Sequence, residues 1–243
     1  LITSSAASDV YKRQDCVIST TESYATTSRT LWDIDVTVIP NAVDVNRFNP
    51  DIDGKIIRDK YALDDEPLAL FVGRLVPHKG IGILIRSLTY TQRGKLLIVG
   101  DGPYKNWLVN LVKKLDLNDR VIFVGPVDDY WLPSYYSATD VVVLPSTSRL
   151  EAFGIVGLEG MATAKPLILS DIPGVRDVIS EKEGYIVEPL DPSAIAEALE
   201  KIWNAPEMAR EMGLRGRERV EKLFSWEKVS KDVESVFKNI LSK

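Results

Sequence analysis

Short apolar runs alternate with longer amphipathic stretches along the chain from Asp15 onward. The apolar runs are rich in Val, Ile and Leu, as expected for strands that are buried on both faces of a parallel sheet. They cover residues 16–19, 37–39, 68–72, 95–99, 121–124, 140–144, 167–169 and 185–187. The pattern predicts an α/β fold, in which helices cover both faces of a parallel sheet.

The amphipathic stretches predict the helices between these strands. They cover residues 81–88, 104–115, 131–138, 154–164, 175–179, 192–204, 208–224 and 226–241. Asp191 and Ser225 are the predicted N-caps of two of them, because Asp and Ser side chains accept hydrogen bonds from the free N–H groups of a first turn. Trp107, Trp131 and Trp203 lie at positions compatible with the core.

The pattern also divides the chain into segments. Residues 1–14 lack periodicity and contain no signal-peptide core, so we expect a non-native or disordered leader. Residues 15–35 form a strand–helix unit ahead of the main domain, which covers 36–225. The terminal helix, 226–243, has an apolar stripe that is expected to be exposed unless another lobe covers it.

Composition limits the possible functions. The 243 residues carry a net charge of −5, and no basic patch for nucleic acid is present. Cys16 and His78 are the single Cys and His of the sequence, which excludes a disulfide framework and a Cys- or His-based metal site. No apolar run reaches the roughly 18 residues of a membrane span. We therefore expect a cytoplasmic protein without a metal site, and leave open peripheral attachment to the inner face of the membrane.

The first candidate site follows the strand at 68–72. Gly73 and Arg74 end this strand, and Lys79 precedes the next helix. Ligands of open α/β sheets lie at the carboxyl ends of the strands, where an Arg fork and a Lys charge can hold a diphosphate. Taken alone, the two residues are better explained as solvated loop cations.

The second candidate is the turn Gly100-Asp101-Gly102-Pro103. A dinucleotide-binding fingerprint would need glycine at position 105, where the chain has Lys105. A nicotinamide-dependent dehydrogenase is therefore a weak alternative. A tight turn explains the glycines better, although Gly100 would also let a ligand approach the backbone.

The third candidate joins a strand to the helix that begins near Gly154. The N–H groups of Phe153, Gly154 and Ile155 lie at the helix N-terminus, where free donors and the helix dipole favour an anion. Glu151 precedes the helix and Glu159 lies inside it, so both carboxylates could border one crevice and accept hydrogen bonds from sugar hydroxyls. For an arbitrary pair of acids, solvated side chains would be the better explanation.

These three features occur together in the order typical of one family. The chain resembles the C-terminal lobe of the family-4 retaining glycosyltransferases, which have the GT-B fold of two Rossmann-like lobes. The matching stretches are 38–44 with Arg47-Phe48, 71–75 with Lys79-Gly80, 100–103, 121–125, 138–140, 144–146, 151–159 and 170–174. The resemblance covers roughly residues 15–243, and the Glu151/Glu159 pair around Phe153-Gly154 is its most specific part.

The resemblance implies a role for each matching residue. Glu151, Arg74 and Lys79 are the implied catalytic residues, with the two cations on the donor diphosphate and Glu151 on the transferred sugar. Glu159 is expected to hold the ribose hydroxyls, and the loop at 126–127 to flank the base. The full expected donor-binding set is Gly73, Arg74, Lys79, Gly100, Pro126, Val127, Glu151, Phe153, Gly154, Ile155 and Glu159.

The resemblance also implies an activity. A hexosyl group would pass from a UDP-, GDP- or ADP-hexose to an acceptor with retention of configuration, through a front-face mechanism and without a cofactor. The acceptor would be a glycan, a lipid or a small molecule held by an N-terminal lobe, of which residues 15–35 would be the last strand and helix. The terminal helix would cross back to that lobe. An alternative is that this chain binds the donor and transfers nothing, because the cleft needs both lobes.

Three positions depart from the family pattern. Ala42 and Ala164 stand where glycine is common, and His78 stands where an acid is common. The two alanines are small changes that leave binding possible. His78 is interpreted as a loop residue beside the phosphate site and not as a catalytic group.

Overall fold

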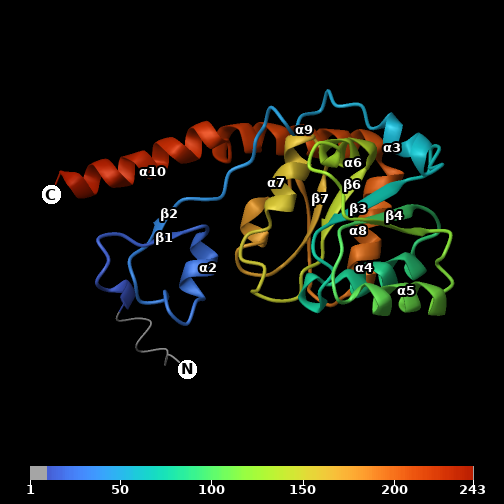
Figure 1. Cartoon of the computed structure of the whole chain (residues 1–243), viewed down its shortest axis with the longest axis horizontal. Coiled ribbons are helices and arrows are strands. Elements are labelled where there is room, and N and C mark those ends of the chain that lie inside the picture. Colours follow the sequence, from blue (N-terminus) through green and yellow to red (C-terminus); the bar gives the residue numbers. More distant parts are fainter. Residues whose placement is uncertain (1–9, 243) are drawn as a thin grey trace.

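The computed structural model describes residues 10–242 and has a six-stranded parallel sheet at its centre (Figure 1). The strand order is β5-β4-β3-β6-β7-β8, so the chain starts in the middle and winds outward in both directions. The strands are β3 (Leu68–Val72), β4 (Lys95–Val99), β5 (Val121–Gly125), β6 (Val141–Leu144), β7 (Leu167–Ser170) and β8 (Gly184–Val187). The predicted α/β class is confirmed.

Helices cover both faces of this sheet because the strand side chains alternate between two cores. Ala69 and Phe71 of β3 face one core, while Leu68 and Leu70 face the other. The first core is closed by α4 (Ile81–Ser87), α5 (Lys105–Lys114) and α8 (Pro192–Asn204). The second is closed by α3 (Lys55–Lys60), α6 (Leu132–Ala138), α7 (Ile155–Ala162) and α9 (Pro206–Leu223).

The predicted strands, and seven of the eight predicted helices, agree with the observed ones to within about two residues at each end. The short helix α3 was not predicted, and the expected helix at 175–179 is a 3-10 turn, η3 (Arg176–Val178). Asp191 and Ser225 cap α8 and the terminal helix as predicted. The core placement was correct for Trp203, which is buried, and wrong for Trp107 and Trp131, which are each 44% exposed.

A smaller unit precedes the main domain. It contains β1 (Ile18–Ser19), α2 (Glu22–Thr26) and β2 (Thr37–Val38), and its two strands pair in parallel. Residues 1–9 of the expected leader lie outside the described residues. Within residues 10–14, Lys12 forms an ion pair of 3.0 Å with Asp33.

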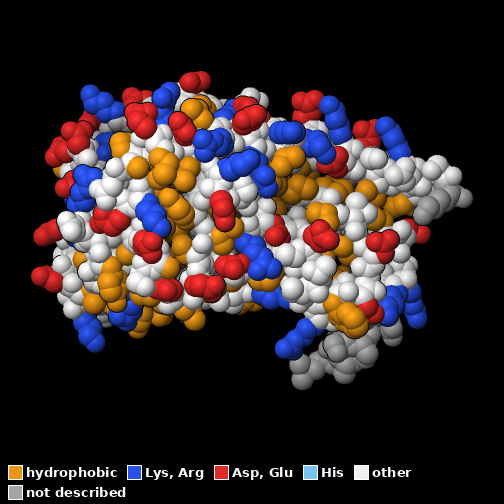
Figure 2. Space-filling model, turned by 180° about the vertical axis from the view of Figure 1, so that it is seen from behind, with side chains coloured by type: hydrophobic (Ala, Val, Ile, Leu, Met, Phe, Trp, Pro, Cys, Tyr) orange, Lys and Arg blue, Asp and Glu red, His pale blue; other side chains and the backbone are white. Residues whose placement is uncertain are grey.

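The terminal helix α10 (Trp226–Leu241) extends from the main domain across to this smaller unit (Figure 1). Val229 is buried against Ile39 and Ala42, so part of the apolar stripe is covered. Phe237 and Leu241 remain 61% and 85% exposed. Figure 2 shows hydrophobic side chains on the main domain and on the end of the molecule that carries α10, with cations and acids interspersed among them.

Candidate functional site

The candidate residues lie at the carboxyl edge of the sheet, around the point where the strand order reverses. That point lies between β3 and β6, which are adjacent in the sheet although two strands separate them in sequence. The chain leaves the two strands on opposite sides, and in open α/β sheets the crevice between the loops that follow such a pair is the usual ligand site. The loop after β3 carries Arg74 and Lys79, and the loop after β6 carries Glu151.

Lys79 and Glu151 form an ion pair at this crevice. Their side chains are 18% and 12% exposed, so water screens the pair only weakly. The Ser146 hydroxyl donates to the same oxygen of Glu151 at 3.1 Å. A lysine ammonium has three N–H donors, so Lys79 keeps donors for a further anion while it holds Glu151.

The backbone around Gly80 brings these two loops together. Gly80 has a left-handed φ of 69°, and a Cβ there would lie 1.8 Å from the carbonyl oxygen of Pro145. Beside this contact the Thr147 N–H donates to the His78 carbonyl at 2.8 Å. The position of Lys79 therefore depends on backbone contacts between the loops after β3 and β6. His78, expected in a loop, lies in a short 3-10 turn, η1 (Pro77–Lys79), within the connection between β3 and α4.

Gly73 and Gly100 bring together, in the same way, the turns that follow β3 and β4. Gly100 has φ of 126°, and a Cβ there would lie 2.0 Å from the Gly73 carbonyl oxygen. The Leu75 N–H also donates to the Asp101 carbonyl at 2.9 Å. Arg74 projects from this contact into solvent, and its side chain makes no polar contact within residues 10–242. An anion in the crevice could be its partner.

The N-terminus of α7 has free backbone donors. Gly154 is the N-cap in a left-handed conformation with φ of 88°. The N–H groups of Phe153 and Gly154 have no acceptor among the described residues, and Ile155 begins the helix. The Phe153 ring is buried and packs edge-on against Phe224 with centroids 6.1 Å apart. These contacts fix the N-terminus of α7, whose free donors are of the kind that suits an anion.

Glu159 lies about one turn further along α7 and is largely buried. The Tyr136 hydroxyl donates to it at 2.5 Å. Burial raises the pKa of Glu159 above its ordinary 4.5, while the Tyr136 hydrogen bond and the charge of Arg47 act in the opposite direction. Arg47 itself lies over the Phe48 ring at 4.8 Å and donates to the Asp129 carbonyl. The site thus holds a carboxylate that has lost much of its hydration and can accept further hydrogen bonds.

Replacing Glu159 with Gln is expected to stabilise the ligand-free protein at pH 7.5. A carboxyl group whose pKa is higher in the folded than in the unfolded protein lowers the stability once the pH rises above its unfolded pKa. Gln carries no charge, so it removes this cost, and its side-chain oxygen still accepts the hydrogen bond from Tyr136. The gain in Tm, a few degrees, should disappear near pH 4, where the unfolded wild type is also protonated. Thermal unfolding between pH 4 and 8 measures this; a loss of stability at pH 7.5 would show that the Glu159 charge is stabilising.

Pro126 and Val127 follow β5 at the same edge. They line a cavity of about 300 Å³ together with Tyr61, Trp131 and Tyr135. The Tyr61 and Tyr135 hydroxyls are 3.1 Å apart. The cavity has flat aromatic walls beside the loop where the base is expected.

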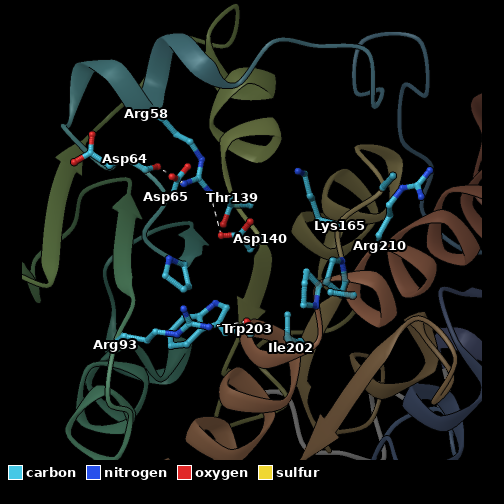
Figure 3. A pocket seen from close by; sticks show the side chains of 15 residues that line it. Arg58, Asp64, Asp65, Arg93, Thr139, Asp140, Lys165, Ile202, Trp203 and Arg210 are labelled. Atoms are coloured by element: carbon cyan, nitrogen blue, oxygen red, sulfur yellow. Dashed lines mark hydrogen bonds and ion pairs between the residues drawn. The ribbon is translucent and has the colours of Figure 1, made fainter.

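A cavity of about 560 Å³ lies at the opposite edge of the sheet (Figure 3). Arg58 pairs there with Asp140 at 3.0 Å and donates to the Ala138 carbonyl at 2.9 Å. Lys165 donates to the Ser137 carbonyl at 2.9 Å, and burial lowers its pKa. Because these cations are already paired within the fold, we assign this edge a structural role.

Comparison with known proteins identifies the family. Residues 53–219 match the sequence profile of the family described as Glycosyl transferases group 1. The chain belongs to this family. The family and the GT-B fold expected from the motifs are confirmed, and a dehydrogenase loses its support.

Relatives of known structure or activity extend the comparison. A GDP-mannose-dependent alpha-(1-6)-phosphatidylinositol monomannoside mannosyltransferase of Mycolicibacterium smegmatis is 33% identical over 77% of this chain and 52% of its own length. Sucrose-phosphate synthase from Thermosynechococcus elongatus has a TM-score of 0.89 and 33% identity, covering 98% of this chain and 61% of that one. The HepE protein of Anabaena, solved with UDP-glucose, shares the fold with a TM-score of 0.86 at 21% identity, over 99% and 68% of the two chains.

The chain spans about half the length of the curated relatives it matches, between 41% and 52% of the first three. Within residues 10–242, no helix combines the length and the apolar character that crossing a bilayer requires.

Sequence reasoning missed three contributors to the site. Tyr136 gave no signal, because its contact with Glu159 joins two helices 23 residues apart in the chain. Ser146 and Arg47 belong to the matching stretches, yet neither was assigned a role. The structure places each predicted residue at the carboxyl edge of the sheet, while the roles of those residues stay predictions.

Proposed function

We propose that this chain binds a nucleotide-sugar donor at the carboxyl edge of its sheet and forms the donor half of a retaining glycosyltransferase. One observation carries the proposal: Lys79 pairs with Glu151 at the topological switch point, beside the free N-terminus of α7. Cations and free N–H groups suit a diphosphate, and the two carboxylates suit the sugar and the ribose.

The proposed chemistry follows from charge. Departure of the nucleoside diphosphate leaves negative charge on the leaving oxygen, which Lys79, Arg74 and the α7 N-terminus can stabilise. Glu151 would orient the sugar through its hydroxyls, and the transfer would proceed on the front face through an oxocarbenium-like transition state. No carboxylate of this chain is then needed as a nucleophile, and we propose no cofactor besides the donor.

The base and the sugar are proposed only as a class. HepE was solved with UDP and UDP-glucose, and the mycobacterial relative is described as GDP-mannose-dependent. The cavity beside Pro126 and Val127 has room for a base of either kind. The donor is therefore proposed to be a UDP-, GDP- or ADP-hexose.

A panel of nucleotides tests donor binding. We expect one of UDP, GDP and ADP, or its hexose derivative, to raise Tm by about 5–10 °C at a concentration about 100 times its Kd. Glu159→Gln should lose most of this protection although its ligand-free Tm is not lower. Arg93→Ala, at the opposite edge of the sheet, serves as the control and should keep it. Equal protection of wild type and Glu159→Gln would contradict the proposal.

A second candidate concerns the chain by itself. It spans about half of its relatives, so we propose that the 243 residues alone bind the donor without transferring the sugar. Turnover by the purified chain would contradict this. Retention is tested on a whole protein that contains this lobe, by the NMR coupling constant of the new anomeric proton.

A further inference from the structure

A cation in the Glu151 loop contacts the smaller unit. Arg149 lies two residues before Glu151 and donates to the Tyr24 carbonyl at 3.0 Å and to the Thr27 carbonyl. Its guanidinium also lies 4.9 Å from the centre of the Tyr24 ring. Both carbonyls lie at the C-terminal end of α2, where free carbonyls and the helix dipole attract a cation.

The other side of the Glu151 loop is supported by the same helix through a turn. Ser23 of α2 donates to the Asp177 carboxylate and accepts from the Gly174 N–H at 3.0 Å. Gly174 in turn lies so close to the loop that a Cβ there would be 2.2 Å from the Ala152 carbonyl oxygen. Glu151 therefore lies between two positions, 149 and 152, that are both tied to α2.

We infer that Arg149 is a positioning residue, through which docking of α2 fixes Glu151 for the transferred sugar. Arg149 does not contact the crevice; its contacts are with α2. Lys79 and Ser146 hold the carboxylate of Glu151, whereas Arg149 and the Gly174 turn hold the backbone that carries it. The smaller unit is thus connected to the sugar end of the site and not to the diphosphate end.

This inference rests on the proposed function, because it assigns Glu151 to the sugar. It predicts an effect that depends on the sugar. Loss of the Arg149 contacts should weaken the binding of a nucleotide sugar more than the binding of the matching nucleoside diphosphate. Only the nucleotide sugar has a sugar to contact Glu151. A general loss of folding would weaken the binding of both ligands alike.

The test compares affinities for three pairs, UDP with UDP-glucose, GDP with GDP-mannose and ADP with ADP-glucose, by calorimetry. For the pair that binds, Arg149→Ala should lower the ratio of nucleotide-sugar affinity to diphosphate affinity about tenfold, and Arg149→Lys should restore part of it. Arg176→Ala is the matched control: it removes a cation from the same edge, but Arg176 pairs with Asp171 and not with α2. An unchanged ratio in Arg149→Ala would overturn the inference.

A ligand-free measurement separates this inference from the proposed function. Hydrogen–deuterium exchange of residues 147–154 should rise in Arg149→Ala and stay at the wild-type level in Arg176→Ala. If no nucleotide binds the wild type, the proposed function fails, and the exchange still decides whether Arg149 holds the loop. Unchanged exchange in Arg149→Ala would refute that role.

Discussion

Replacing Lys79 with Met is expected to remove diphosphate binding and to lower the free energy of unfolding by about 3 kcal/mol. Met fills a similar volume but leaves Glu151 as a carboxylate with only the Ser146 hydroxyl as partner. Because Glu151 is 12% exposed, water cannot replace the lost ammonium well. Urea unfolding and calorimetric titration with the best nucleoside diphosphate measure the two effects.

The double variant Lys79→Met/Glu151→Gln separates stability from binding. It contains no unpaired charge, so most of the lost stability should return. Binding should not return, since the cation for the diphosphate is still absent. Recovery of diphosphate affinity together with stability would show that Lys79 acts on the fold alone.

Gly100→Ala is expected to be one of the most damaging glycine substitutions at the site. Its Cβ would lie 2.0 Å from the Gly73 carbonyl oxygen at a φ of 126°, so the backbone of one turn must move. We expect a loss of about 3 kcal/mol or more in stability, with weaker nucleotide binding because Gly73 and Arg74 are displaced. Urea unfolding and the thermal-shift panel measure both.

Gly125→Ala provides the matched control. Gly125 also has a left-handed φ, of 85°, but a Cβ there would meet nothing within 4 Å. Only the backbone strain remains, which costs about 1–2 kcal/mol. If Gly100→Ala cost no more than Gly125→Ala, the close approach of the two turns would not be an essential feature of the site.

The sequence predicted the parts of the site that depend on local pattern. Each strand end could be read from an apolar run, so the placement of Arg74, Lys79 and Glu151 at one edge followed from the rule for parallel sheets. The start of α7 was recognisable because Gly154 separates the loop from an apolar helix. The helix α3 was missed because six residues with four charges, Lys55 to Lys60, carry too little pattern.

The parts that depend on packing between distant segments could not be predicted. The Tyr136–Glu159 hydrogen bond exists because α6 and α7 lie side by side on one face of the sheet. The contact of Arg149 with α2 spans 125 residues of sequence. In the same way, Trp107 looked like a core residue by its spacing, yet it stacks on Tyr104 at the surface with ring centroids 4.4 Å apart.

The most direct test of the central claim is a crystal structure of this chain with the nucleoside diphosphate that protects it best. We predict the diphosphate beside Lys79 and the N-terminus of α7, with the ribose hydroxyls on Glu159 and the base at Pro126 and Val127. A nucleotide bound elsewhere, for example in the cavity around Arg58 and Lys165 at the opposite edge of the sheet (Figure 3), would contradict the account.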